Sequence, residues 1–186
     1  MNGAPHDAIS PEERAEPVVV VPYDPAWEGT FRRVRERVAG ALGDLAVGVE
    51  HVGSTAVPGL AAKPIVDVDA IVRRAEDVPE AIRALAAIGY AHLGDLGIAG
   101  REAFRAPSDL PRHHLYVCAV ATPELRAHLA FRDALRADRA LAERYAALKR
   151  DLAERYRDDR DAYTEGKSAF VRSVLRGEQK DRRRRR

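Results

Sequence analysis

Apolar residues near the start of the chain form one short run and then a helical stripe. The β-branched run Val18–Val21 lies between two prolines, which is typical of a short buried strand. Asp24 followed by Pro25 favours a helix start, and the apolar residues after them recur at three- and four-residue steps. The predicted buried stripe consists of Trp27, Phe31, Val34, Val38 and Leu42.

The order of the remaining elements predicts the fold class. Further strands are expected at residues 47–52, 64–72, 101–106 and 113–121, with a helix at 78–88. After Thr122 the apolar spacing is helical throughout, which predicts about three helices. Because strands and helices come first and only helices follow, we expect an α+β chain, with a sheet domain at 17–121 and a helical C-terminal part at 122–176 packed on it.

Composition narrows the class of protein. The 186 residues, of which 46% are hydrophobic, suit one globular domain with a helical addition. The single cysteine, Cys118, cannot form an internal disulfide, and the first residues lack the basic and apolar blocks of a signal peptide. No apolar run approaches the roughly 18 to 20 residues needed to cross a bilayer, so a membrane protein is excluded. A cytoplasmic protein is therefore expected.

The net charge of +2 depends on the end of the chain. Five consecutive arginines, Arg182–Arg186, close the sequence; without them 26 basic residues stand against 29 acidic ones, which gives −3. Residues 177–186 are expected to be a disordered basic tail and residues 1–16 a flexible leader. Because the basic character belongs to the tail, a nucleic-acid partner is disfavoured.

The most informative stretch is HVGSTAVPGLAAKPIVDVD, from His51 to Asp69. Asp67 and Asp69 are two positions apart in its predicted strand, so their carboxylates share one face of the sheet, roughly 6 to 7 Å apart. Two like charges on one strand face are unfavourable unless water or a cation lies between them. Carboxylate oxygens of this kind suit Mg²⁺ or Mn²⁺ together with substrate phosphates.

A turn at Gly53-Ser54-Thr55 precedes the carboxylates and complements them. Glycine lets backbone N–H groups approach an anion, and the Ser54 and Thr55 hydroxyls add donors, which together make a small phosphate cradle. Each motif alone is more often a solvated polar row or an ordinary turn. Their combination favours a binding site, because the apolar neighbours Val66 and Val68 make carboxylates in this strand costly.

These residues carry a family resemblance. The turn Gly53-Ser54 followed by Asp67-Val68-Asp69 resembles the signature of the DNA-polymerase-beta-like nucleotidyltransferase superfamily. More closely, HVGSTAVPGLAAKPIVDVD with the segments GREAF, PRHHLYV, AFRDALRA and YTEGKSAF resembles the GrpB family of small bacterial proteins over about residues 17–176. The resemblance implies a nucleotidyltransferase-like mixed β-sheet with flanking helices, followed by a C-terminal layer of about three helices. Fusion of such domains to dephospho-CoA kinase in some bacteria hints at a nucleotide or coenzyme A context.

The superfamily chemistry, carried over to this sequence, implies roles for the motif residues. Asp67 and Asp69 would bind one or two Mg²⁺ ions, which clamp an NTP and orient an attacking hydroxyl at its α-phosphorus. Ser54 and the backbone of Gly53 would contact the β- and γ-phosphates. The transfer would release pyrophosphate.

Many superfamily members carry a third carboxylate on a neighbouring strand, as metal ligand or base. Here the corresponding strand reads His113-His114-Leu115-Tyr116-Val117, so His114 is expected to take that place as ligand or base. Tyr116, on the same face, is a second-tier candidate. His51 is another, although strand alternation leaves open whether His51 or Glu50 faces the site.

Bound triphosphate also needs positive charge. Lys63 and Lys167 are the first candidates, because they are lysines in an arginine-rich chain and lie in family-like segments. Tyr163 is one helical turn from Lys167 and is expected to stack a base beside it. Further candidates are Arg101 and Arg105, on one face of a predicted strand, and the second-tier residues Arg112 and Lys149.

Two functions are compatible with these residues. The favoured one is a metal-dependent nucleotidyltransferase, an enzyme that moves a nucleoside monophosphate from an NTP to an unidentified small-molecule acceptor or, as the weaker option, to a protein. The alternative is a non-catalytic nucleotide- or coenzyme-A-related binding protein with a degenerate site, which the missing third carboxylate favours. Arg132 and Asp133 are interpreted as a lock between the first C-terminal helix and the sheet, and Trp27 as core.

Overall fold

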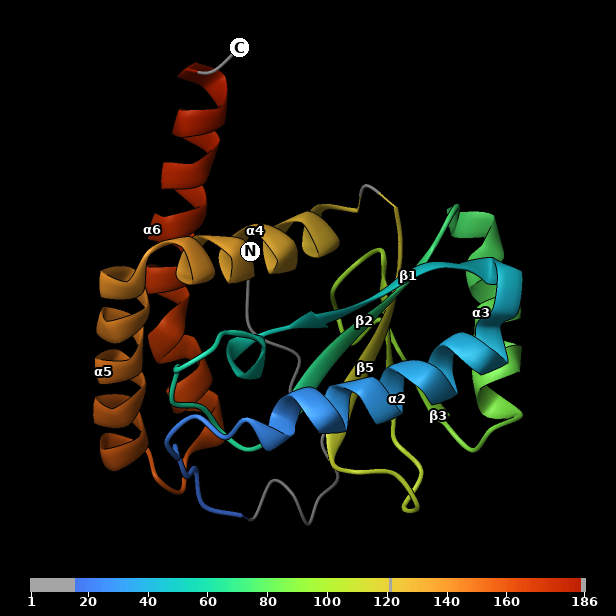
Figure 1. Cartoon of the computed structure of the whole chain (residues 1–186), viewed down its shortest axis with the longest axis horizontal. Coiled ribbons are helices and arrows are strands. Elements are labelled where there is room, and N and C mark those ends of the chain that lie inside the picture. Colours follow the sequence, from blue (N-terminus) through green and yellow to red (C-terminus); the bar gives the residue numbers. More distant parts are fainter. Residues whose placement is uncertain (1–15, 121, 185–186) are drawn as a thin grey trace.

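A five-stranded mixed sheet forms the centre of the computed structural model (Figure 1). The structure describes residues 16–120 and 122–184, the last seven of them as backbone only. The strands are β1 (Ala46–Val52), β2 (Val66–Val72), β3 (Ala91–Gly94), β4 (Arg101–Arg105) and β5 (His113–Ala119), in the spatial order β1-β2-β5-β4-β3. β2 and β5 are parallel, and every other neighbouring pair is antiparallel. The α+β class and the mixed sheet are confirmed.

Four of the five strands lie where the apolar pattern predicts them. The pattern does not predict β3, a four-residue edge strand with no buried residue that ends at Gly94. The strand expected at residues 18–21 is wrong, because this segment makes only one isolated bridge, between Val21 and Ala62. Its Val18 instead donates a backbone hydrogen bond to Arg157 at 2.7 Å and packs on Tyr163, so the segment serves the helical layer.

One face of the sheet is covered by α2 (Ala26–Leu42) and α3 (Val78–Ala86). All five residues of the predicted stripe on α2 are buried, including Trp27. They meet the apolar residues of β2 and β5 that point to this side, namely Val68, Ala70, Leu115 and Val117. This dry side is the main core, so the carboxylates of β2 must face the other way.

Three helices follow the sheet, as predicted: α4 (Pro123–Ala137), α5 (Arg139–Arg155) and α6 (Arg160–Arg184). α4 contacts β1 and β5, and α5 and α6 pack on α4 and on each other at one end of the sheet (Figure 1). None of the described helices has the length and apolarity that a membrane span requires.

The C-terminal segment differs from the disordered tail expected at residues 177–186. The backbone of α6 is helical through Arg184, and residues 185 and 186 lie outside the described residues. The sequence holds no proline after Pro123 that would end the helix earlier. The expected leader falls almost wholly on residues 1–15, which also lie outside the described part.

Gly166 sets the approach of α6 to α5. A Cβ atom added there would lie 2.5 Å from Cδ2 and 3.0 Å from Cδ1 of the buried Leu152, whereas one at Gly29 on α2 would meet nothing within 4 Å. Both substitutions to alanine gain helix propensity, but only Gly166→Ala overpacks a contact. We expect Gly166→Ala to be less stable than Gly29→Ala by about 1–3 kcal/mol in urea unfolding. Equal stabilities would show that Leu152 repacks without cost.

Candidate functional site

The strand register brings the two carboxylates of β2 to the face that α4 covers. Asp67 pairs with Val52 on β1 and His114 on β5, and Asp69 pairs with Glu50 and Tyr116. The Asp69 side chain is 0% exposed and that of Asp67 is 29% exposed. A buried carboxylate needs hydrogen bonds or a cation, so the partners of these two groups decide what the site can do.

Each carboxylate is paired with a histidine. His114 Nδ1 lies 2.9 Å from Asp67 Oδ1, and His128 Nδ1, from α4, lies 2.8 Å from Asp69 Oδ2. Burial raises the pKa of Asp67, but the hydrogen bond and charge of His114, with the Lys63 ammonium, outweigh it and leave this pKa lowered. Burial likewise opposes protonation of His128, yet the bond and charge of Asp69 give it a raised pKa. Asp69 therefore favours the charged form of His128, and a histidine lies against each carboxylate.

Polar atoms remain without partners around these pairs. Among the described residues, Asp69 Oδ1, His114 Nε2 and two guanidinium nitrogens of Arg101 are buried and accept or donate no hydrogen bond. The donor chemistry fits a hard cation at Asp67 and Asp69, because an open carboxylate oxygen stands inside the site. No group of three or more His, Cys, Asp or Glu side chains within the described residues is arranged to hold a metal ion. Of the predicted set, Asp67 and His114 are hydrogen-bonded to each other, whereas Asp69 is bonded to His128.

Gly53 holds the predicted phosphate turn against Asp67. It follows β1, opens the short 3-10 turn Ser54–Ala56, and has φ +70° and ψ −168°, a backbone conformation that side chains rarely allow. A Cβ atom on Gly53 would collide with Asp67 Oδ2 and lie 2.9 Å from its Cγ. Glycine is therefore required twice, by the backbone angle and by the close approach of the carboxylate.

Thr55 and His51 lie away from this site. The Thr55 hydroxyl and His51 Nε2 are 3.0 Å apart, and the His51 ring stacks on Phe31 at 4.7 Å, on the α2 side of the sheet. Burial lowers the pKa of His51 to about 4. Strand alternation instead turns Glu50 toward α4, where its carboxylate accepts a 2.7 Å hydrogen bond from Arg132. The structure thus answers the open choice between His51 and Glu50 in favour of Glu50, and Arg132 locks α4 to the sheet as predicted.

A cavity of about 300 Å³ is lined by Asp67 but not by Asp69 or His114. It is lined by Val52, Gly53, Ser54, Asp67, Arg101, Tyr116, Ala127, His128, Phe131, Tyr145, Lys167, Val171 and Leu175. Six of these are predicted site residues: Gly53, Ser54, Asp67, Arg101, Tyr116 and Lys167. The cavity therefore joins the phosphate turn, a carboxylate and positive groups from β4, α4 and α6.

The lysines gather around one tyrosine. The ammonium groups of Lys167 and Lys63 lie 4.5 and 5.4 Å from the centre of the Tyr163 ring. Burial, together with the nearby Lys63 charge and against the opposing charge of Asp67, lowers the pKa of Lys167 to about 7. Tyr163 itself is 1% exposed, so the expectation that it stacks a base is wrong: its ring is covered by core residues and the lysines.

Three other predicted contacts lie outside the cavity lining. Lys149 is 2% exposed and donates a 2.5 Å hydrogen bond to the Ala61 carbonyl, so it fastens the loop after the phosphate turn. Arg112 forms a 2.6 Å ion pair with Glu16. Arg105 shares the strand face of Arg101, as predicted, but its side chain is exposed and does not line the cavity.

Sequence reasoning did not select His128. The sequence feature that could have indicated His128 is its position on the buried face of α4. It lies three residues after the buried Leu125 and on the same helix face as Leu135. A histidine on an apolar stripe is commonly a core residue, and only the register of β2 shows that Asp69 lies beneath it. Phe131 and Tyr145 line the same cavity, and their helical spacing in the sequence predicts only packing between helices.

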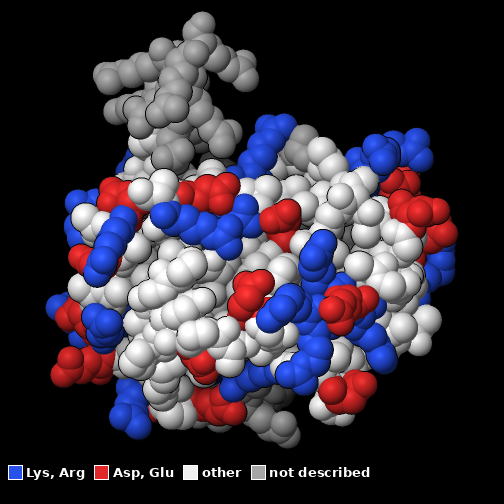
Figure 2. Space-filling view, viewed as in Figure 1, with Lys and Arg blue, Asp and Glu red and all other residues white. Residues whose placement is uncertain are grey.

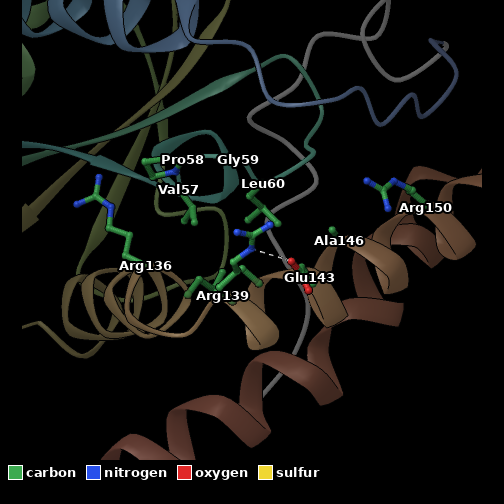
Figure 3. A pocket seen from close by; sticks show the side chains of 11 residues that line it. Val57, Pro58, Gly59, Leu60, Arg136, Arg139, Glu143, Ala146 and Arg150 are labelled. Carbon is green, nitrogen blue, oxygen red and sulfur yellow. Dashed lines mark hydrogen bonds and ion pairs between the residues drawn. The ribbon is translucent and has the colours of Figure 1, made fainter.

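A larger cavity, of about 700 Å³, lies between residues 57–60 and helices α4 and α5 (Figure 3). It contains none of the predicted site residues. Arg136 donates two hydrogen bonds to the Ala56 carbonyl, of 2.7 and 2.9 Å, and Arg139 donates one of 2.9 Å to the Glu143 carboxylate. Figure 2 shows Lys and Arg interspersed with Asp and Glu over the visible face. The smaller cavity is the better site, because titratable groups converge there.

Residues 17–177 match the family model described as GrpB protein. The chain belongs to the GrpB family. A crystal structure of the GrpB protein from Enterococcus faecalis is 36% identical, with a TM-score of 0.79 over 88% of this chain and 98% of that one. The matched residues include the whole sheet, and the motif from His51 to Asp69 lies within them.

GrpB relatives include longer proteins. UPF0157 protein YqkA of Bacillus subtilis (strain 168) is 34% identical over 157 residues, 84% of this chain and 46% of that protein. A dephospho-CoA kinase of Mycolicibacterium paratuberculosis (strain ATCC BAA-968 / K-10) is 29% identical over 92% of this chain and 48% of its own length. This GrpB-family chain thus spans about half the length of both relatives.

The GrpB fold is also similar to a polymerase. The Cid1 poly(U) polymerase, in a crystal structure with MgGTP bound, has a TM-score of 0.51 and 15% identity over 73% of this chain and 45% of Cid1. At this identity the likeness concerns the fold alone. It shows that the GrpB sheet and its flanking helices have the fold seen in part of that polymerase.

Proposed function

We propose that the protein is a metal-dependent nucleotidyltransferase that moves a nucleoside monophosphate from an NTP to a small molecule. The observation that carries the proposal is the contact between two parts of the motif. The Gly53 turn lies directly against Asp67, and both line one cavity with Lys167. A phosphate cradle, a carboxylate and a lysine at one point are the groups that triphosphate transfer needs.

The residues divide into three roles. The Gly53 backbone and Ser54 hydroxyl bind the outer phosphates, and Lys167 neutralises part of their charge. Asp67 and Asp69 would hold Mg²⁺ or Mn²⁺, which would supply positive charge to the phosphates during transfer. Phe131, which is only partly buried, lines the apolar side of the cavity beside the buried Tyr145 and offers aromatic surface to a base.

His114 is the candidate base. Asp67 accepts from its Nδ1 side, which orients the ring and leaves Nε2 as the proton acceptor. His114 Nε2 is buried and has no hydrogen-bond partner among the described residues. An acceptor hydroxyl placed there would lose its proton to Nε2 as it attacks. In this role an imidazole replaces the third carboxylate.

The test is transfer of label. Protein, each of the four α-labelled NTPs, Mg²⁺ or Mn²⁺ and a metabolite extract are incubated, and products are separated by chromatography. We expect a labelled product whose formation stops with a chelator and falls at least 100-fold in Asp67→Asn, which keeps the shape but removes the charge. Arg35→Gln, on an exposed position of α2 and away from the cavity, should behave as the unaltered protein. Label transfer that persists undiminished in Asp67→Asn would contradict the assignment.

A non-catalytic role is the second candidate, and two observations favour it. No third carboxylate joins the pair within the described residues, and a relative named as a dephospho-CoA kinase contains a matching stretch. On this view the cavity binds a nucleotide or a coenzyme A precursor and releases it unchanged. Binding of Mg-NTP in calorimetry without transfer of any label would select this role.

A further inference from the structure

Arg101 is buried inside the candidate site without a described partner for its charge. It begins β4, is 3% exposed and lines the cavity that also contains Asp67 and His128. Its Nε and Nη2 atoms are buried and donate no hydrogen bond within the described part of the chain. No ion pair joins it to any described carboxylate. A guanidinium in such a place is costly unless something else meets it.

Tyr116 supplies only part of that compensation. The guanidinium carbon lies 4.4 Å from the centre of the Tyr116 ring, which is a cation–π stack. Stacking fixes the plane of the guanidinium but leaves its edge, where the N–H donors lie, directed elsewhere. An edge with unused donors matches the two oxygens of a carboxylate or a phosphate. The arrangement is a preformed receptor for an anion.

The sheet register separates Arg101 from the phosphate turn. Arg101 pairs with Cys118, which pairs with Ile71, so its backbone is four residues beyond Asp67 along the strands and two strands away. These offsets correspond to roughly 13 Å along the sheet and roughly 10 Å across it. Gly53 leaves β1, on the other side of β2 and at the other end of the strands. The carboxylates thus stand between Gly53 and Arg101.

We infer that Arg101 binds the acceptor substrate, and that this acceptor is a small molecule carrying a carboxylate or phosphate besides the nucleophilic hydroxyl. The inference rests on the proposed function. In an in-line displacement the attacking and leaving oxygens lie on opposite sides of the α-phosphorus. Because the leaving pyrophosphate is held at Gly53 and Ser54, the acceptor enters from the Arg101 side. Its anionic group docks on Arg101 and its hydroxyl reaches the carboxylates.

In the proposed transfer one bond to the α-phosphorus forms and one breaks. The acceptor oxygen forms a bond to the α-phosphorus of the NTP, and the bond from that phosphorus to the bridging oxygen breaks. Pyrophosphate leaves, and the acceptor proton passes to His114 Nε2. No oxidant or reductant is required, and Arg101 itself takes no part in bond making.

The experiment compares three acceptors with one skeleton: glycerol, glycerate and glycerol 3-phosphate. Protein saturated with Mg²⁺ and a non-hydrolysable NTP is titrated with each in calorimetry. We expect at least one of the two anions to bind at least 10-fold more tightly than glycerol, which separates charge from shape. Arg101→Gln should lower that anion's affinity at least 10-fold and change the NTP affinity less than 2-fold. Arg101→Lys should keep part of the anion affinity, because lysine retains the positive charge but lacks the planar guanidinium group.

The unfolding temperature of each variant shows whether a loss of binding comes from a loss of folding. Removing a charge that is buried for a ligand relieves the empty protein, so Arg101→Gln should unfold at the same or a higher temperature. Arg35→Gln, the exposed control on α2, should leave both affinities and the unfolding temperature unchanged. If Arg101→Gln unfolds the protein, Arg101→Lys is used for the binding comparison.

The outcomes separate this inference from the proposed function. A fall in NTP affinity as large as the fall in anion affinity would place Arg101 in the triphosphate subsite and overturn the inference. Equal affinity for glycerol and both anions would also overturn it. If Mg-NTP binds but no label is ever transferred, the proposed function fails, while Arg101-dependent binding of glycerate or glycerol 3-phosphate still supports an anion subsite.

Discussion

Gly53→Ala is expected to abolish Mg-NTP binding and to lower the free energy of unfolding by about 2–4 kcal/mol. Alanine must adopt φ +70° and ψ −168°, and its Cβ atom collides with Asp67 Oδ2. The chain has two ways to relieve the collision. Either the turn moves, and the backbone N–H groups no longer point at a phosphate, or Asp67 moves, and its bond with His114 breaks. Either movement separates the phosphate turn from the Asp67 carboxylate.

The measurements are urea unfolding and calorimetry with a non-hydrolysable NTP. Gly97→Ala is the matched control, because Gly97 has φ +78° but a Cβ atom there meets nothing within 4 Å. Gly97→Ala should cost about 1 kcal/mol from backbone strain alone and leave binding intact. Gly53→Ala protein that still binds Mg-NTP with unchanged affinity would mean that the turn does not hold the phosphates.

Periodicity predicted that both carboxylates of β2 lie on one face of the sheet. Asp67 and Asp69 share a face because alternation in an extended strand is a local property, and the apolar residues between them had to be buried on the other side. The same rule could not orient His51, because β1 ends beside a turn and its apolar positions do not fix a register by themselves. The pairing of Glu50 with Asp69 is what fixes it.

Contacts between distant segments could not be predicted in this way. His128 meets Asp69 across 59 positions of sequence, and no pattern within α4 specifies what lies beneath that helix. The burial of Tyr163 could not be predicted either. Tyr163 and Lys167 share a helix face, as predicted, but α6 packs with that face inward, which covers the tyrosine. Residue type and spacing therefore selected the candidate residues, whereas the packing of the helical layer decides which of their side chains line the cavity.

Stability is expected to rise with pH above neutrality because of Lys149. Burial, with the charges of Lys167 and Arg150 and against that of Asp67, lowers the pKa of this ammonium from its ordinary 10.5 to about 7. Between these two values the unfolded chain binds a proton that the folded chain does not, so the free energy of unfolding increases as pH rises. From about pH 7 to about pH 9 the gain from this one group is about 2 kcal/mol.

Lys149→Met should remove that gain while keeping the volume of the side chain. The Ala61 carbonyl loses its 2.5 Å donor in the variant, so the absolute stability is a poor readout and the slope against pH is the informative one. We expect the unfolding free energy of the unaltered protein to climb about 2 kcal/mol more than that of Lys149→Met over this range. Arg144→Met, an exposed change on the same helix, should keep the full slope. Parallel curves for the unaltered protein and Lys149→Met would show that this lysine stays charged in the fold, and that the loop after the phosphate turn is fastened by an ammonium.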